Sequence, residues 1–186
     1  RSNFTKCMQV SHVEVNGKVL GVVGAGTIGR EVIKVAQALG MKVLAYTRTP
    51  RADEDNLKYV SLEELLKQSD YISLHCPLTP QTRHMINKET IAMMKPTAYI
   101  INTGRGALID EPALIEALKE GRIAGAGLDV QETEPPVQDN PLYDMPNVIL
   151  TPHMGWKGLE TRQRLVSILA ANIQAFDEGR PQNVVS

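Results

Sequence analysis

Four stretches of the sequence place chemically useful residues directly after an apolar run. GVVGAGTIGREV (21–32) contains a glycine-rich turn, and IINTGRG (100–106) holds Arg105 between two glycines. GLDVQETEPP (127–136) contains Glu134 before a proline pair, and LTPHMGW (150–156) contains His153. Residues of these types cradle phosphates, fork onto carboxylates and exchange protons near neutral pH. Their joint chemistry depends on the elements that bring them together.

The glycine-rich turn, GAGTIG (24–29), fits the pattern G-x-G-x-x-G. It follows an apolar run, opens a helical pattern and is followed by a second apolar run, and in this context the pattern predicts dinucleotide binding. Gly24 permits the tight turn, Gly26 leaves room for a pyrophosphate, and Gly29 lets helix and strand pack closely. Free N–H groups at the helix start, at Thr27 and Ile28, face the anion. A glycine-rich turn without a ligand is the alternative interpretation.

The end of the second predicted strand bears on the choice between NAD and NADP. An acidic residue there would bond the ribose 2′-hydroxyl of NAD, but the sequence runs Thr47-Arg48-Thr49-Pro50-Arg51. Because arginine forks onto phosphate, these residues favour a 2′-phosphate and hence NADP(H) over NAD(H). In the alternative interpretations both arginines are solvated, or Arg48 stacks on the adenine of NAD.

Apolar runs alternate with helical patterns along most of the chain. Strands are predicted at 18–24, 41–46, 70–75, 98–103, 122–130 and 147–152, and helices at 27–39, 61–68, 87–94, 110–121 and 159–178. Continuous apolar strands are typical of a parallel sheet that is covered on both faces. The sequence therefore predicts a Rossmann-type, doubly wound α/β domain with helices on both faces.

Helix boundaries and faces are predicted from individual residues. Ser61, Asn87 and Asp110 are typical N-caps, and Gly40 and Gly121 are placed to end helices. The apolar face expected for the first helix consists of Ile28, Val32, Val35, Ala36 and Leu39. The apolar positions expected for the last helix are Leu165, Val166, Leu169, Ile173 and Phe176.

Composition excludes several classes of protein. The 186-residue chain has a formal net charge of −1, which gives no argument for a nucleic-acid partner or an anionic membrane. No apolar run is long enough to span a membrane, and no signal peptide is visible. Cys7 and Cys76 fit free thiols in a reducing compartment, so a cytoplasmic protein is expected. No metal site is predicted, because no His/Cys cluster has ligand spacing.

Taken together, the stretches resemble the D-isomer-specific 2-hydroxyacid dehydrogenases. The resemblance extends from Gly17 onward and rests on HCPLTPQT, INKETIAMMKP, INTGRGALID, LDVQETEP and TPHMGW, which occur in the family's order. YTRTP and ETRQRLVSILAANIQAFDEGRPQNVVS are most similar to the glycerate dehydrogenase and hydroxypyruvate/glyoxylate reductase branch. The resemblance implies an oxidoreductase that transfers hydride between a nicotinamide cofactor and a small 2-oxo or 2-hydroxy acid.

The resemblance assigns catalysis to Arg105, Glu134 and His153. Arg105 would hold the carboxylate and ketone of a 2-oxoacid. His153 would protonate the developing alkoxide, and Glu134 would hydrogen-bond the other imidazole nitrogen and favour the imidazolium. The plainer alternatives are an exposed loop cation, a solvated loop acid and a structural histidine. Glu132 lies two residues from Glu134, so an error of register is also open.

The resemblance also implies cofactor contacts beyond the glycine-rich turn. His75, Cys76 and Pro77 would pass near the adenosine, and Thr103 and Asp129 would lie near the nicotinamide. The complete predicted cofactor-binding set is Gly24, Gly26, Thr27, Ile28, Gly29, Thr47, Arg48, Thr49, His75, Cys76, Pro77, Thr82, Thr103, Gly104, Asp129, His153 and Gly155. As an alternative, His75 is structural or lies at the surface, which is also the interpretation of His12 and His84. Trp156 either shapes a pocket, makes an interdomain contact or simply packs.

Three segments are expected from the resemblance. Residues 17–158 would form the dinucleotide-binding domain, and residues 159–186 a helix and tail that return toward a substrate domain. Residues 1–16 would lead in from that domain, most of which the sequence lacks. Because it would supply one wall of the cleft, this 186-residue chain is expected to bind dinucleotide with little turnover. A homodimer is also implied.

Hydroxypyruvate/glycerate and glyoxylate/glycolate are the substrates that the resemblance favours. A dinucleotide-sensing regulatory protein is the alternative function, because transcriptional corepressors that resemble this family can retain the same three residues. A dehydrogenase of formate or phosphonate is a third possibility. Glu134 together with His153 argues against the formate branch.

Overall fold

The computed structural model describes residues 13–49 and 51–185, so Cys7 and His12 lie outside the described residues. The chain divides into two compact units, of which one ends at Leu150 and the other begins at Thr151. In the described residues, the first unit contains the sheet and the second contains one long helix. The domain limits expected at residues 16 and 158 stay predictions.

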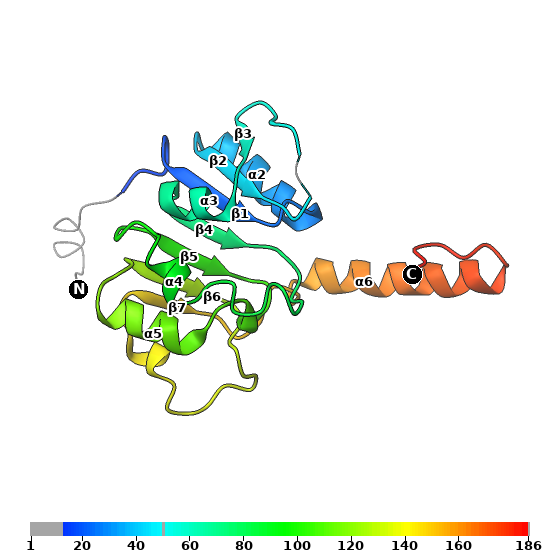
Figure 1. The fold of residues 1–186 in the computed structure, drawn as a ribbon. Coiled ribbons are helices and arrows are strands. Elements are labelled where there is room, and N and C mark those ends of the chain that lie inside the picture. Colours follow the sequence, from blue (N-terminus) through cyan, green and yellow to red (C-terminus); the bar gives the residue numbers. More distant parts are fainter. Residues whose placement is uncertain (1–12, 50, 186) are drawn as a thin grey trace, which may run out of the picture. The chain divides into compact units, whose positions relative to one another are not determined.

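The strands of the first unit are β1 (Val19–Val23), β2 (Lys42–Tyr46), β3 (Leu57–Tyr59), β4 (Tyr71–Leu74), β5 (Tyr99–Asn102), β6 (Gly125–Leu128) and β7 (Val148–Leu150). They form a seven-stranded parallel sheet in the order β3-β2-β1-β4-β5-β6-β7 (Figure 1). The six predicted strands are confirmed, each somewhat shorter than predicted. Strand β3 was not predicted, because three residues are too few to show a period.

Helices cover both faces of this sheet, as the sequence predicted (Figure 1). They are α2 (Thr27–Ala38), α3 (Leu62–Gln68), α4 (Lys88–Ile91) and α5 (Glu111–Lys119), with short 3-10 turns η1 (Gly106–Leu108) and η2 (Pro141–Asp144). Helix α2 packs on one face, against Leu20, Val22 and Val43, whereas α3, α4 and α5 bury their apolar sides on the other. The doubly wound α/β class is therefore confirmed.

Helix α2 confirms the predicted apolar face only in part, because Ala36 is buried and Val32 is partly buried against the core. Gly29, Ile33 and Ala36 are its buried residues. The predicted face is exposed at Ile28, Val35 and Leu39. A Cβ on Gly29 would stand 2.1 Å from the carbonyl oxygen of Gly24, so this position must face the turn. Ile33 and Ala36 follow Gly29 at helical spacing and are buried with it.

At least one predicted end is confirmed for each of α2, α3, α4 and α5, and the C-terminal end of α4 is corrected. Ser61, Asn87 and Asp110 are N-caps whose side chains accept a backbone N–H from the first turn of α3, α4 and α5. Gly40 and Gly121 follow the ends of α2 and α5 with φ values of 76° and 67°, which suits glycine. Helix α4 is only four residues long, shorter than the predicted 87–94.

The loop that precedes β3 satisfies the outer backbone groups of this edge strand. Leu57 exchanges two backbone hydrogen bonds with Glu54, at 2.9 and 3.0 Å. The Tyr59 N–H donates to Asp53 Oδ1 at 2.8 Å. An edge strand whose backbone groups are already hydrogen-bonded is a poor template for pairing with a strand of another chain. The pairing also fixes the end of the loop over 47–56, which the sequence associated with cofactor choice.

The second unit contains α6 (Leu159–Asp177), which confirms the predicted long helix. None of the residues of α6 is buried in the described structure, and its predicted apolar positions are all exposed. The guanidinium of Arg162, near the start of α6, lies 5.7 Å from the ring centroid of Trp156, which precedes the helix, and this is within range of a cation–π interaction. Among the described residues, no helix is long and apolar enough to cross a membrane.

Candidate functional site

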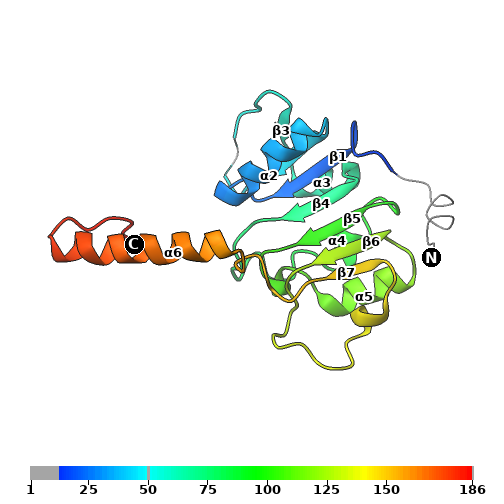
Figure 2. The same ribbon diagram turned by 180° about the vertical axis from the view of Figure 1, so that it is seen from behind.

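The carboxyl ends of the parallel strands lie along one edge of the sheet (Figure 2). Gly24 follows β1, Thr47 follows β2, His75 follows β4, Thr103 follows β5 and Asp129 follows β6. The chain leaves β1 toward β2 and β3, then resumes at β4 on the other side of β1. Open α/β sheets bind ligands where the strand order diverges in this way, which here is between β1 and β4.

Gly24 lies where the backbones that follow β1 and β4 meet. A Cβ on Gly24 would stand 2.6 Å from the backbone nitrogen of Cys76, and the φ of Gly24 is +100°. The Gly24 N–H donates to the Tyr46 carbonyl oxygen at 2.9 Å, and the His75 N–H donates to the Val23 carbonyl oxygen at 2.8 Å. The fold itself therefore requires glycine at position 24.

Gly26 is a different case, because the fold leaves space around it. A Cβ on Gly26 would meet no atom within 4 Å, and its φ of −78° suits any residue. Gly26 is the N-cap of α2, and no side chain caps this helix or brings an acid into its first turn. Helices α3 and α5 have both features. The start of α2 therefore presents N–H groups that suit an approaching anion.

A hollow of about 780 Å³ lies over the glycine-rich turn. Eight residues of the predicted cofactor-binding set line it: Gly24, Gly26, Thr47, Arg48, Thr49, Cys76, Pro77 and Thr82. Residues that were not in that set also line it: Ala25, Tyr46, Arg51, Leu62, Thr79, Gln81 and Met85. Its size is that of a small-molecule site. Thr79 could have been predicted from its place in the segment CPLTPQT, whereas no sequence pattern indicated that Leu62 and Met85 would line the hollow.

Other members of the predicted set are not among the residues that line this hollow. They are Thr27, Ile28, Gly29, His75, Thr103, Gly104, Asp129, His153 and Gly155. Thr82 lines the hollow, but its hydroxyl also donates to the Pro77 carbonyl oxygen at 2.7 Å and so shapes the loop. Gly29 is excluded from the lining because it packs against the turn.

The loop after β2 is held at its far end by a charged cluster. Arg30 on α2 donates to Glu54 Oε1 at 3.0 Å and lies 3.3 Å from the Tyr59 hydroxyl. The hydrogen bond from Arg30 holds the pKa of the Glu54 carboxyl below its ordinary value, and the charge of Arg51 acts in the same direction. The segment that brings Arg48 and Arg51 to the hollow is therefore anchored to the helix that begins at the glycine-rich turn.

His75 and Cys76 contribute mainly to the shape of the turn after β4. His75 Nε2 lies 2.8 Å from the hydroxyl of Ser73, and burial lowers the pKa of the imidazole, which favours its neutral form. Burial raises the pKa of the Cys76 thiol, and Cys76 is a free cysteine 3.6 Å from the sulfur of Met85. A protonated thiol behaves as a small apolar wall of the hollow.

The turn that carries Arg105 is cross-linked by a buried amide that the sequence analysis did not single out. Asn102 is fully buried at the end of β5, where its Oδ1 accepts from the Gly104 N–H at 3.0 Å. Its Nδ2 donates to the Arg105 carbonyl oxygen at 2.9 Å. The Arg105 side chain is exposed, and its Nη1 donates to the Gly104 carbonyl oxygen at 2.8 Å. The guanidinium is thus presented at the sheet edge on a rigid turn.

The loop after β6 places two glutamates in different surroundings. The exposed Glu134 accepts the Gln131 N–H at its Oε1, at 3.2 Å. The Glu132 carboxylate instead lies 2.6 Å from His84 Nε2 and 3.1 Å from the Arg83 guanidinium. Glu132 therefore already has two hydrogen-bond donors as partners. This observation bears on whether Glu132 or Glu134 is the glutamate of the predicted catalytic set.

His153 belongs to the second unit and has a φ of +48°. Its N–H donates to the Thr151 carbonyl oxygen at 3.1 Å. The structure therefore places Arg105 and Glu134 on the first unit and His153 just beyond the division. The joint action of the three residues stays a prediction.

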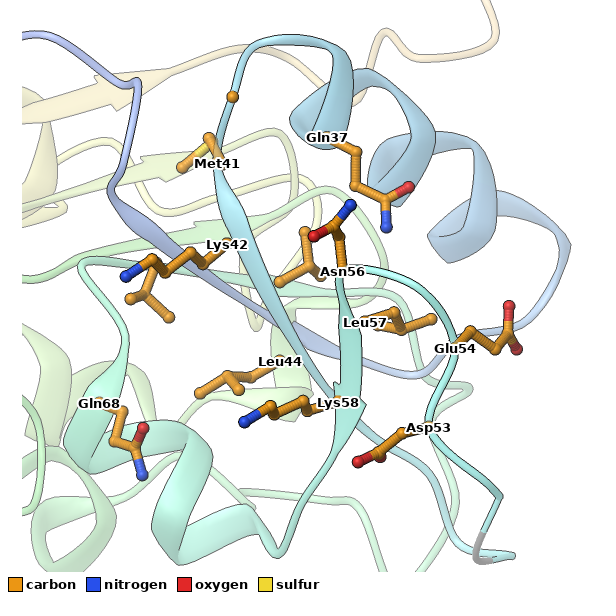
Figure 3. Close-up of a pocket in the computed structure, with 13 residues that line it drawn as sticks. Gln37, Met41, Lys42, Leu44, Asp53, Glu54, Asn56, Leu57, Lys58 and Gln68 are labelled. Carbon is orange, nitrogen blue, oxygen red and sulfur yellow. The ribbon is translucent and has the colours of Figure 1, made fainter.

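A second hollow, of about 660 Å³, lies beside β2 and β3 near the beginnings of these strands (Figure 3). Lys42, Lys58 and Gln68 line it, as do Gln37 and Asn56. It contains none of the predicted site residues. In the described part of the chain, no group of three or more His, Cys, Asp or Glu residues is placed to hold a metal ion.

Comparison with known proteins places these features in a family. Residues 1–155 match the family model for the NAD-binding domain of the D-isomer specific 2-hydroxyacid dehydrogenases. A hydroxypyruvate reductase of Blautia hydrogenotrophica is 50% identical over 176 residues, which are 94% of this chain and 55% of the relative. A glyoxylate reductase of Thermococcus litoralis is 49% identical over 176 residues, with 92% and 53% covered.

A solved structure shares the same architecture. An acyclic imino acid reductase in complex with NADPH and D-Arg is 37% identical, with a TM-score of 0.86 over 98% of this chain and 60% of that one. The chain thus spans about half the length of the curated relatives that it matches.

Proposed function

The chain belongs to the D-isomer specific 2-hydroxyacid dehydrogenase family, and from this membership we propose that it is the dinucleotide-binding part of an NAD(P)-dependent reductase of small 2-oxoacids. We propose hydroxypyruvate and glyoxylate as its substrates, because relatives at 50% and 49% identity are named for their reduction. The observation that carries the proposal is the open glycine-rich turn at the same sheet edge as Arg105.

The residues present fit a dinucleotide. An added Cβ on Gly26 would meet nothing, and the first turn of α2 is uncapped, so a pyrophosphate can approach the backbone. The adjoining hollow, with Thr47 and Pro77 in its wall, would take the adenosine. When bound, the nicotinamide supplies the hydride. The contributions of the chain are binding, orientation and proton transfer.

Arg105 would bind the substrate. Its guanidinium carries five donors in a fixed fork, which suits the carboxylate and neighbouring ketone oxygen of a 2-oxoacid. Asn102 holds the backbone on both sides of Arg105, so the backbone that carries the guanidinium loses little conformational entropy on binding. The exposure of Arg105 leaves it accessible to substrate.

Glu134 and His153 would handle the proton. His153 donates to the substrate oxygen as negative charge develops there, and accepts the proton in the reverse direction. In the complete protein, Glu134 would accept a hydrogen bond from the other imidazole nitrogen and stabilise the protonated ring. The position of Glu132 supports Glu134 as the partner, because the Glu132 carboxylate is already engaged with His84 and Arg83.

The pH dependence of reduction tests this pair. Loss of the Glu134 carboxylate removes a group that is proposed to stabilise the protonated imidazole, which is the form that reduction needs. We expect the alkaline limb of kcat/KM for reduction to move to lower pH in Glu134→Gln. An unmoved limb contradicts the assignment of Glu134.

The preference for NADP(H) over NAD(H) rests on the loop after β2. Arg48 and Arg51 line the hollow, and no carboxylate of the described residues lines it with them. Solved relatives contain NADPH in one case and NAD in others, and the family model is named for NAD, so the preference rests on Arg48 and Arg51 alone. We expect Arg48→Asp to weaken NADPH binding at least tenfold more than NADH binding, as measured by fluorescence titration. Equal losses for both cofactors would refute the preference.

The rest of the substrate site is proposed to come from sequence outside this chain, and the assembly to be a homodimer. The relatives are nearly twice as long as the matched region, which supports the proposal on the substrate site. The homodimer is proposed from the family resemblance alone. Neither the structure nor these relatives favours the dinucleotide-sensing alternative, and the cytoplasmic location stays a prediction. Size-exclusion chromatography with light scattering of the complete protein tests the dimer.

A further inference from the structure

Glu132 lies at the centre of a charged cluster that joins three segments of the first unit. Its carboxylate can only accept hydrogen bonds, so the His84 Nε2–H donates to it at 2.6 Å, and the Arg83 guanidinium donates at 3.1 Å. The Glu132 side chain is 22% exposed and that of His84 34% exposed. A charge-assisted contact of this length, partly shielded from water, is worth more than an ordinary surface pair.

The backbone around Glu132 is held from a second direction. The Glu132 N–H donates to Glu111 Oε2 at 3.0 Å, at the start of α5. The other oxygen of Glu111 accepts from Asn140 Nδ2 at 2.8 Å, and the same Nδ2 donates to Gln131 Oε1 at 3.0 Å. Asn140 is buried. The loop is thus fixed on both sides by groups whose hydrogen bonds are directional.

This loop packs directly against the turn that carries Arg105. A Cβ on Gly106 would stand 1.9 Å from the Gln131 carbonyl oxygen and 2.4 Å from the Glu132 nitrogen. The His84 N–H donates to the Ala107 carbonyl oxygen at 2.8 Å. The segment with His84, the turn with Arg105 and the loop with Glu132 therefore form one connected unit.

Glu134 depends on the same loop, because its carboxylate accepts the Gln131 N–H. A shift of the loop moves Gln131, and with it the carboxylate that is proposed to orient the catalytic imidazole. The backbone of Gly106, next to Arg105, would move as well. We infer that Glu132, clamped by His84 and Arg83, is a positioning residue that holds Arg105 and Glu134 in one geometry for 2-oxoacid reduction.

The inference rests on the proposed function for its catalytic consequence, but not for the clamp itself. Glu132→Ala removes the clamp, and Glu132→Gln keeps an oxygen at the same distance from His84 and Arg83. Glu116→Ala is the matched control. Glu116 lies on α5 and, like Glu132, pairs with two cations, Lys88 and Arg122. All variants are made in the complete protein.

Steady-state reduction of hydroxypyruvate separates positioning from general damage. Misplacement of catalytic groups by a fraction of an ångström to 1 Å costs up to about 100-fold in rate, so Glu132→Ala is expected to lower kcat roughly 10- to 100-fold. The KM for the dinucleotide should stay within about twofold, because the hollow at the glycine-rich turn does not include this cluster. Glu132→Gln should recover most of kcat, and Glu116→Ala should behave as the wild type.

The pair with His84 is tested by a double variant. His84 has a φ of +50°, which asparagine tolerates, so His84→Asn removes the imidazole without new backbone strain. If both groups act as one clamp, His84→Asn combined with Glu132→Ala loses no more kcat than Glu132→Ala alone. Fully multiplicative losses would overturn the clamp.

Amide hydrogen exchange tests the clamp without any turnover. The backbone amides at positions 131 and 132 should exchange about five- to tenfold faster in Glu132→Ala than in the wild type. In Glu116→Ala their exchange rates should equal those of the wild type. If the wild type does not reduce 2-oxoacids, the proposed function fails and exchange alone decides the inference. Unchanged exchange, or a Glu132→Ala enzyme with wild-type kcat, overturns it.

Discussion

Substitution of alanine at two glycines of the same turn should have opposite consequences for stability and binding. Gly24 has a φ of +100° and no room, whereas Gly26 has an ordinary φ and open space. Both variants add one methyl group within a three-residue stretch. The comparison therefore separates what the fold needs from what a dinucleotide needs.

The cost at Gly24 follows from two observations. An L side chain in a positive-φ conformation costs about 1–2 kcal/mol, and a Cβ at 2.6 Å from the backbone nitrogen of Cys76 forces the two backbones apart. Overpacking of this kind costs about 1–3 kcal/mol. Gly24→Ala should therefore lower the free energy of unfolding by about 2–5 kcal/mol, a large share of the total for an ordinary domain.

The free energy of unfolding should hardly change in Gly26→Ala. Alanine restricts the unfolded chain, which stabilises by about 0.4–1 kcal/mol, but it is a poorer N-cap than glycine by a similar amount. The new methyl would occupy the side from which a pyrophosphate approaches the backbone. An overpacking cost of about 1–3 kcal/mol corresponds to a roughly 5- to 150-fold loss of affinity.

Urea unfolding and titration with NADH and NADPH, followed by nicotinamide fluorescence, measure the two quantities on the same samples. The expected result is an unstable Gly24→Ala and a stable Gly26→Ala that binds weakly. Wild-type affinity in Gly26→Ala would refute the approach of the pyrophosphate to this backbone. Equal destabilisation of both variants would refute the interpretation of the open space at Gly26.

Three further predictions concern stability. Asn102→Ala leaves the Gly104 N–H and a carbonyl oxygen without their partner and should cost about 1–3 kcal/mol in urea unfolding, and an unchanged midpoint would contradict this. Because burial lowers the pKa of His75, the unfolded chain binds its proton more readily, so stability should fall as pH drops from about 6.5 through the lower folded pKa. His75→Asn should flatten that part of the pH–stability curve, and an equally steep curve would count against it. Burial acts to raise the pKa of Asp70, but hydrogen bonds from Lys95 and a backbone N–H outweigh it and leave the pKa below its ordinary value. Lys95→Met should therefore cost about 1 kcal/mol at pH 7, after allowance for partial exposure, and progressively less as pH falls below about 4, whereas a pH-independent loss would rule out the ion pair as the cause.

Elements with a strong local signal were predictable from the sequence. The strand, turn and helix around Gly24 follow from glycine spacing between apolar runs, and the caps at Ser61 and Asp110 follow from side chains that bond the first helical turn. Thr47 and Pro77 both line the hollow over the turn. They follow different strands, and the carboxyl ends of parallel strands lie along one edge of the sheet.

Features that depend on packing were not predictable. The buried face of α2 is set by the contact of Gly29 with the Gly24 carbonyl, so the apolar Ile28 is exposed in the described structure despite its helical spacing. Strand β3 is defined by pairing with β2 and by the preceding loop, not by its own three residues. No sequence pattern connected His84 with Glu132, because the two residues lie 48 positions apart.

In the proposed function, Arg105 binds the carboxylate of a 2-oxoacid for reduction by a nicotinamide cofactor. The most direct measurement is the oxidation of NADPH and NADH by the complete protein with hydroxypyruvate or glyoxylate, followed at steady state for the wild type and Arg105→Gln. We expect turnover by the wild type and a loss in kcat/KM of at least about 100-fold in Arg105→Gln, because the forked charge-assisted contact is removed. A wild type that binds dinucleotide without reducing any 2-oxoacid, or an Arg105→Gln variant with undiminished kcat/KM, would contradict it.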